Sequence, residues 1–165
     1  MNAAEVFKIC LSNNESEVLK MITSDPTCVN VQDEYSYTPL HELCSTDLTN
    51  IAQLLIDNGA NINSVNDEGI TPLHIVNSLE MAELLIKNGA DIDAIDNEGC
   101  SPLIRLAMEP SDYEAGHDYI AEIMEHLLKL GAKPDFKNTF GDTALSLSAG
   151  IKNRELMIKT FISNT

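Results

Sequence analysis

The stretch Thr38-Pro39-Leu40-His41 decides the fold of this chain, because it returns as Thr71-Pro72-Leu73-His74. It recurs in weaker form as Ser101-Pro102-Leu103-Ile104 and Thr143-Ala144-Leu145-Ser146. A second phrase follows the first three copies, and it ends in Asn58-Gly59-Ala60, Asn88-Gly89-Ala90 and Leu130-Gly131-Ala132. Two phrases that recur together indicate a copied structural unit, so we expect a repeat protein.

Each unit is typical of a turn, two short helices and an extended arm. A hydroxyl such as that of Thr38 can cap a helix N-terminus, and a proline in the next position loses no hydrogen bond there. The glycine of the second phrase is suited to end a helix in the left-handed conformation. Apolar and polar residues alternate in 61–65 and 91–95, which predicts an extended arm, and 66–69 and 96–99 supply the turn.

This unit resembles the ankyrin repeat over nearly the whole chain. The matched residues are Asp33, 38–41 and 59–60, then Gly69, 71–74 and 89–90, then Gly99, 101–103 and 131–132. The step from Asp33 to Asn66 is 33 residues, the ankyrin period, whereas the next two steps are 30 and 42 residues. The resemblance implies an all-α repeat solenoid of stacked helix-turn-helix pairs with short hairpin-like turns.

The departures from the pattern weaken individual repeats. Ser36 stands where the pattern has glycine, and Ile104 and Ser146 stand where it has histidine. In the ankyrin pattern this histidine bonds the threonine of its own phrase and neighbouring backbone, so we expect that structural role for His41 and His74. Ile104 and Ser146 are expected to remove this polar bridge from the later repeats.

The spacing predicts a single elongated domain over residues 1–165. It comprises an N-terminal helical cap (1–32), a repeat (33–65), a shortened repeat (66–95), a repeat with an insertion near 109–119 (96–137) and a C-terminal capping repeat (138–165). The caps should turn a polar face to water. Amphipathic helices are expected in the first cap from Val6, Ile9, Cys10, Val18, Leu19, Met21 and Ile22, and in the last from Leu145, Leu147, Leu156, Ile158, Phe161 and Ile162. No stretch is long and apolar enough to span a bilayer and the first residues lack a basic region followed by an apolar one, so we expect a cytoplasmic protein.

The sequence contains no motif that predicts catalysis, a cofactor or a bound metal. The acids between Asp91 and Gly99 lack the spacing of a calcium loop. Cys10 and Cys44 are interpreted as reduced core residues. Glu122 and His126 lie four residues apart in the helical pattern and form the one ligand-like pair, for which surface hydrogen bonding is the simpler interpretation.

Charge is the strongest functional indication. The formal net charge is −16, and residues 33–128 contain 19 acidic residues against Lys87 and Arg105, a balance of −17. Such a surface repels nucleic acid and anionic membranes and attracts a basic protein. The alternative is that the acids only keep an exposed repeat soluble. We expect a monomer that binds a protein partner of basic character, and neither nucleic acid nor a membrane.

The turns and the outer faces of the first helices are not needed for packing between repeats, so we expect them to line a concave groove. The resemblance to ankyrin proteins, which commonly bind partners there, implies these candidate partner-binding residues: Glu34, Tyr35, Tyr37, Asp67, Glu68, Ile70, Asn97, Glu98, Cys100, Arg105, Met108, Phe140 and Asp142, with Ser45 on the same floor. Tyr35, Tyr37, Ile70 and Phe140 are expected to be apolar side chains facing solvent among acids, a composition typical of interfaces. The insertion between Glu109 and Tyr119, with Tyr113 inside it, is a rival site.

Four functional hypotheses follow. The first is a non-enzymatic module that binds a partner protein through its acidic concave face. The second is an inhibitor or immunity-type protein that masks a basic enzyme, such as a nuclease, by charge complementarity. The third is a metal-dependent enzyme at Glu122 and His126, and the fourth is a scaffold inside a larger assembly.

Overall fold

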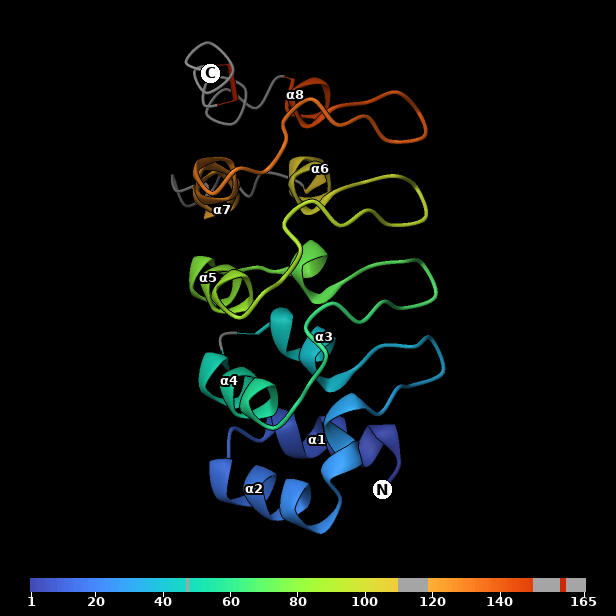
Figure 1. The fold of residues 1–165 in the computed structure, drawn as a ribbon, viewed down its shortest axis with the longest axis vertical. Helices are drawn as coiled ribbons and strands as arrows, with labels where there is room; N and C mark the ends of the chain where they lie inside the picture. Colours follow the sequence, from blue (N-terminus) through green and yellow to red (C-terminus); the bar gives the residue numbers. More distant parts are fainter. Residues whose placement is uncertain (47, 110–118, 150–157, 160–165) are drawn as a thin grey trace.

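The chain forms an elongated stack of short helices (Figure 1). The computed structural model describes residues 1–46, 48–109, 119–149 and 158–159. The helices are α1 (Ala3–Leu11), α2 (Glu15–Ser24), the 3-10 helix η1 (Pro26–Asn30), α3 (Pro39–Cys44), α4 (Thr49–Asp57), the 3-10 helix η2 (Pro72–Ile75), α5 (Leu79–Lys87), α6 (Pro102–Met108), α7 (Tyr119–Lys129) and α8 (Ala144–Leu147). The described residues contain no strand, so the predicted helical repeat solenoid is confirmed.

The helices stand in two columns. The first helices of the repeats contact one another in the order α1, α3, η2, α6, α8, and the second helices in the order α2, α4, α5, α7. Between the columns lies one continuous core, which includes the fully buried side chains of Leu43, Leu55, Leu85 and Ile123. The turns before α3, η2, α6 and α8 all project to the same side of the stack (Figure 1).

Local sequence explains where the first helices begin. The side chains of Thr38, Ser101 and Thr143 cap α3, α6 and α8 by accepting a hydrogen bond from the backbone N–H three residues on. The shortened repeat differs, because it has the 3-10 helix η2 in place of an α-helix. Its three missing residues leave no room for a full α-helix, and the Asn77 N–H and side chain instead bond the carbonyls of Cys44 (3.3 Å) and Ser45 (2.8 Å).

The two repeat histidines have the structural role expected for them. In both, Nδ1 lies 2.8 Å from the threonine hydroxyl of the same phrase. The Nε2 atoms reach the next repeat, His41 at 2.9 Å from the Ile70 carbonyl and His74 at 3.0 Å from the Cys100 carbonyl. Burial lowers the pKa of both rings, so they are held neutral.

The sequence predicts that Ser146, which replaces the histidine, removes this bridge from the last repeat, and this prediction is only half right. Ser146 replaces the histidine, yet its hydroxyl accepts a hydrogen bond from the Thr143 N–H at 2.9 Å, and the Ser146 N–H bonds the Thr143 hydroxyl at 3.1 Å. A hydroxyl is long enough to reach the cap residue of its own repeat. It is too short to span the distance that an imidazole ring covers.

The arms between repeats are not regular extended segments. The residues 62–63 and 92–93 are turns, so the predicted alternation of two faces does not hold along the whole arm. A ladder of side chains joins the arms instead. The amide of Asn30 donates to the Gly59 carbonyl (2.9 Å) and accepts from the Asn61 N–H (2.7 Å), and Asn63 repeats both bonds with Gly89 (3.0 Å) and Asp91 (2.9 Å).

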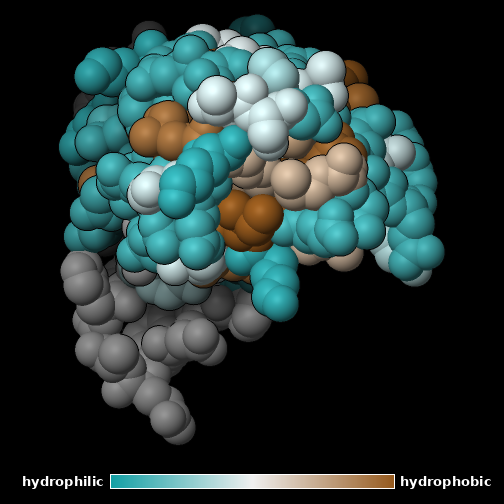
Figure 2. Space-filling model, turned by 90° about the horizontal axis from the view of Figure 1, so that it is seen from below, coloured by the Kyte–Doolittle hydropathy of each residue, from teal (hydrophilic) through white to brown (hydrophobic). Residues whose placement is uncertain are grey.

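The first helical pair closes one end of the stack. Seen end-on, this face is mostly hydrophilic with some apolar groups at its centre (Figure 2). Val6, Cys10, Val18, Met21 and Ile22 are buried as expected, Ile9 is half-buried, and Leu19 is exposed. In the last cap Leu145 and Leu147 pack against the core and Ile158 is buried, whereas Leu156, Phe161 and Ile162 lie outside the described residues.

Candidate protein-binding surface

The four projecting turns share one geometry. We call them fingers 1 to 4 and define them as residues 32–37, 65–70, 95–100 and 137–142. The second residue of each finger is Asp33, Asn66, Asp96 or Asn138, and its side-chain oxygen accepts hydrogen bonds from the backbone N–H groups two and four residues on, at 2.8 to 3.0 Å. The aspartate or asparagine therefore fixes the backbone of its finger without using the side chains at the tip.

Successive fingers are also bonded to one another. The N–H groups of Asp67, Asn97 and Thr139 donate to the carbonyls of Tyr35, Glu68 and Glu98 in the preceding finger, at 3.2, 2.9 and 2.8 Å. Ser36 has a left-handed backbone with φ +65°, and its hydroxyl bonds the Asp67 carboxylate at 2.6 Å. The fingers therefore form a connected row, which presents its tips in fixed positions.

The structure divides the predicted partner-binding residues by exposure. Exposed to solvent are Glu34, Tyr35, Ser45, Asp67, Glu68, Asn97, Glu98, Met108 and Phe140. Tyr37, Arg105 and Asp142 are half-buried. Ile70 and Cys100 are buried, at 5% and 0% exposure.

The expectation that Ile70 and Cys100 face solvent is therefore wrong. Each directly precedes a helix cap, and its carbonyl receives the histidine of the preceding repeat, so its side chain turns toward the body of the stack. Tyr37 is only partly available, because its ring packs edge-on against His41 with 5.5 Å between centroids. Of the four predicted solvent-facing apolar residues, Tyr35 (60% exposed) and Phe140 (74%) are well exposed.

Two exposed apolar residues on the fingers were missed. Val65 is 50% exposed and Ile95 is 62% exposed, and each opens its finger. Their sequence signal was present, since each is the last apolar residue before the aspartate or asparagine. In an alternating arm each lies on the face opposite Ile62 or Ile92, which pack against the core. Each finger thus carries one large, exposed apolar side chain among Tyr35, Val65, Ile95 and Phe140.

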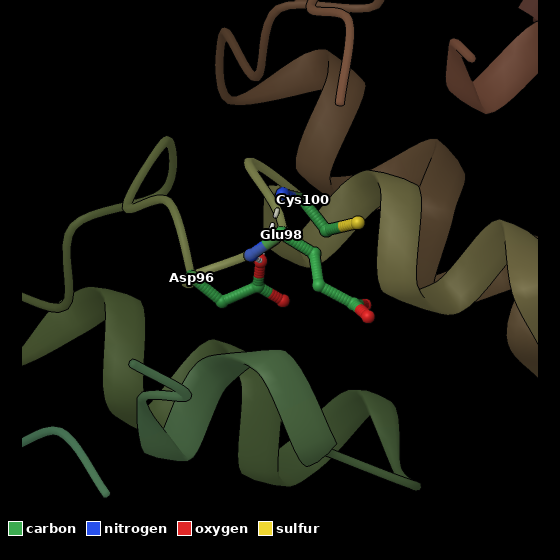
Figure 3. Close-up of side chains that lie close together, drawn as sticks. All are labelled: Asp96, Glu98 and Cys100. Atoms are coloured by element: carbon green, nitrogen blue, oxygen red, sulfur yellow. Dashed lines mark hydrogen bonds between the residues drawn. The ribbon is translucent and has the colours of Figure 1, made fainter. Parts of the chain in front are cut away.

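The structure brings together one group that resembles a metal site. Figure 3 shows Asp96, Glu98 and Cys100 side by side in finger 3, with their ligand atoms within 4.8 Å of one another. A cation is already present, because the Arg105 guanidinium lies 2.5 Å from Asp96 and 3.1 Å from Glu98. Asp96 also accepts the N–H groups of Glu98 and Cys100. Asp96 and Glu98 therefore neutralise Arg105, and the geometry favours an ion-pair network over metal binding.

Arg105 and Cys100 have pKa values that fit this network. Partial burial acts to lower the pKa of Arg105, but the hydrogen bond and charge of Asp96 outweigh it and raise the pKa. Burial raises the pKa of the Cys100 thiol, as it raises the pKa of Cys10 to about 12. The four cysteines are free and buried, so their protonated thiols are poor nucleophiles.

The other candidate sites have less support. His126 faces Glu83 of α5, with Nε2 3.6 Å from a carboxylate oxygen, and neither it nor Glu122 belongs to a group of three metal ligands within the described part of the chain. The insertion is described only at its margins, where Tyr119 is 45% exposed. Tyr113 lies outside the described residues, so the rival site stays a prediction. No helix among the described ranges has the length and apolar character needed to cross a membrane.

The negative charge is not confined to the fingers. Exposed acids also lie on the second helices, as Asp57 of α4 and Glu80 and Glu83 of α5 show. What distinguishes the fingers is the combination of acids with exposed apolar side chains on a fixed backbone. This combination is typical of a protein interface.

Comparison with known proteins agrees with the geometry. A sequence model of the family described as ankyrin repeats (3 copies) matches residues 6–96. Among curated proteins, the chain is 42% identical over 57 residues to the BCL-6 corepressor-like protein 1 of Homo sapiens, an alignment that covers 34% of this chain and 3% of that protein. It is 33% identical over 73 residues to the human protein phosphatase 1 regulatory subunit 27, covering 44% of this chain and 47% of that protein. It is 30% identical over 73 residues to the ankyrin repeat-containing protein P1E11.10 of Schizosaccharomyces pombe, covering 44% and 35%.

In each case the aligned part spans less than half of the relative's length. The matched family model, in contrast, covers more than half of this chain and includes most of the first helical pair, fingers 1 and 2 and both bridging histidines. The stacked helical pairs and the projecting fingers have the architecture that this match requires. The chain belongs to the ankyrin repeat family.

Proposed function

We propose that the protein is a non-enzymatic binding module that engages a partner protein through an acidic concave face formed by the fingers and the first helices. Ankyrin repeats generally serve in protein–protein interaction, as stacked repeats provide an extended surface for a partner. The observation that carries the proposal is the row of exposed tips, above all Tyr35, Glu68 and Phe140, whose backbone is fixed by the hydrogen bonds within and between fingers.

Physical chemistry supports this use of the row. Because the backbone of the fingers is already ordered, binding need not order it, and exposed aromatic rings contribute strongly once a partner covers them. One matched relative is named as a regulatory subunit of a phosphatase, which fits a role in binding another protein. The buried thiols and the paired acids of finger 3 give no support to catalysis.

The test compares two forms of the protein as bait in cells of its source. Tyr35→Ala combined with Phe140→Ala removes the exposed rings, and Leu19→Ala combined with Leu130→Ala removes two exposed apolar residues away from the fingers, at 45% and 49% exposure. Both forms should keep the helical circular dichroism of the wild type. We expect the finger variant to lose a protein that the wild type and the control variant both retain. Equal recovery of the same proteins by all three would rule out the finger face.

A second function is favoured by the charge of −17 over residues 33–128. The partner in that case is a basic enzyme, which the module inhibits by covering its cationic site. Affinity should then fall steeply as salt is added, because screening shortens the reach of exposed charges to about 8 Å at physiological ionic strength. Affinity for the captured partner that is constant between low and high salt would exclude this function and leave the first one standing.

A further inference from the structure

The fourth residue of each finger has the same position in all four fingers. These residues are Tyr35, Glu68, Glu98 and Phe140, and each donates its N–H to the aspartate or asparagine two residues earlier, at 2.8 to 3.0 Å. The carbonyls of Tyr35, Glu68 and Glu98 bond the next finger. The four side chains therefore form an ordered series, which we call the tip row. Its sequence is aromatic, acidic, acidic, aromatic.

The two ends of the tip row are its most exposed apolar members. Tyr35 is 60% exposed and Phe140 is 74% exposed. Large apolar groups this exposed on a fixed backbone are candidates for anchors that a partner buries. The ends of the row therefore favour apolar side chains in the partner.

The middle of the tip row favours cations. Glu68 forms no ion pair with any residue in the described part of the chain, whereas Glu98 is partly neutralised by Arg105 at 3.1 Å. The same two fingers also expose Val65 and Ile95. Lysine and arginine have an apolar stem and a charged end, so they can cover an aliphatic side chain and still reach a carboxylate. The middle fingers offer both kinds of group, with the stronger charge at Glu68.

The length of the row sets the length of the matching segment. Packed helices lie about 9 Å apart, so three repeat steps from Tyr35 to Phe140 span roughly 27 Å. An extended peptide rises about 3.3 Å per residue, which makes that span about eight residues. We propose that the tip row binds an extended, basic peptide segment of the partner protein, with an apolar residue at each end about eight residues apart and arginine or lysine between them. This proposal rests on the proposed function and specifies the partner's chemistry.

Two synthetic peptides of equal composition test the order of groups. The first has leucine at both ends and two arginines in its middle third, with serine and glycine elsewhere. The second exchanges the leucines and arginines, so its charge and hydrophobicity are unchanged. Fluorescence anisotropy with the full chain should show the first peptide binding about tenfold more tightly, the difference expected when two anchors are correctly placed.

Variants of the protein then assign the preference to the row. Tyr35→Ala combined with Phe140→Ala should remove the tenfold preference, and Glu68→Gln should weaken binding of the first peptide by about threefold and reduce its salt dependence. Leu130→Ala, at a residue that is 49% exposed but lies away from the fingers, should change nothing. Circular dichroism confirms that each variant is folded before binding is compared.

The possible outcomes separate this proposal from the proposed function. If the two peptides bind with equal affinity, or if neither binds, the proposed order of apolar and basic residues in the partner segment is wrong. If the variant that combines Tyr35→Ala with Phe140→Ala still loses its partner in the capture experiment, the finger face remains the binding surface. In that case only the proposed chemistry of the peptide is wrong. If capture is unchanged as well, both proposals fall.

Discussion

Replacing Gly69 with alanine should destabilise the protein through the contact between fingers 2 and 3. Gly69 has φ +76°, and a methyl group there would lie 2.8 Å from the Asn97 side-chain oxygen and 2.9 Å from the Asn97 backbone nitrogen. Contacts below 3.0 Å are not tolerated, so finger 3 must move. That movement strains the hydrogen bond from the Asn97 N–H to the Glu68 carbonyl, which is 2.9 Å long.

The expected loss of stability has three parts. A residue with a side chain in the left-handed region costs about 1–2 kcal/mol relative to glycine. Loss of the bond between the fingers adds about 1 kcal/mol, and the displaced Asn97 contacts add a similar amount. We therefore expect the free energy of unfolding to fall by about 3–4 kcal/mol, measured by urea denaturation followed by circular dichroism.

The other fingers supply the controls. At Gly99 the nearest atom to an added methyl group is the Thr139 nitrogen at 3.2 Å, and at Gly141 no atom lies within 4 Å among the described residues. All three glycines have a positive φ of 73° to 86°, so the backbone penalty and the change in the unfolded chain are shared. The loss should be largest for Gly69→Ala, intermediate for Gly99→Ala and smallest for Gly141→Ala. Equal losses at the three positions would refute the claim that the fingers stabilise one another.

Three further predictions concern the contacts behind the fingers. Asn63→Asp keeps the acceptor for the Asp91 N–H but loses the donor to the Gly89 carbonyl, so the free energy of unfolding should fall by about 1 kcal/mol in a urea titration. Arg105→Met leaves the fully buried Asp96 carboxylate without its cation and should cost about 2–3 kcal/mol by the same measurement, whereas a loss below 0.5 kcal/mol would show that the N–H donors suffice. Burial lowers the pKa values of His41 and His74 from 6.5 in the folded protein. Their contribution to stability is therefore complete above pH 6.5, where the unfolded chain also keeps them neutral, and it is lost as the pH falls below that value. Urea titrations at pH 7.5 and 5.5 should therefore show lower stability at the acidic pH, and His74→Gln should reduce this difference.

The helical stack was predictable from the sequence because its signals are local. A hydroxyl before a proline begins a helix, and a glycine after Asn58 or Asn88 ends one. Both features depend on neighbours within a few residues. The role of the two histidines came from the resemblance to the ankyrin pattern, because the carbonyls that they reach lie 29 and 26 residues away. The shortened repeat was also visible as a spacing of 30 residues, but its consequence was not, since only packing shows that the remaining residues form a 3-10 helix.

Exposure at the fingers was harder to predict because it depends on the neighbouring repeat. Ile70 and Cys100 occupy turn positions, and nothing in the turn itself shows that a histidine from the preceding repeat holds their carbonyls. Val65 and Ile95 belong to the same arms as the partly buried Ile62 and Ile92, and which side of an arm faces solvent depends on the repeats that pack against it. The sequence could not indicate that Arg105 neutralises the acids of finger 3, because that ion pair joins a finger to the helix beside it.

The fingers separate folding from recognition within a few residues. Asp33, Asn66, Asp96 and Asn138 fix the backbone, and the last residue of each finger leads directly into a helix cap. Tyr35, Glu68 and Phe140, the fourth residues of fingers 1, 2 and 4, make their structural bonds through the backbone, so these side chains are not required for the fold. Glu98 in finger 3 differs, because its carboxylate also pairs with Arg105. Tyrosine, glutamate and phenylalanine all occupy that position in this chain on the same scaffold. Because a change of side chain there alters the surface without altering the stack, the tip row is where we expect partner specificity to reside.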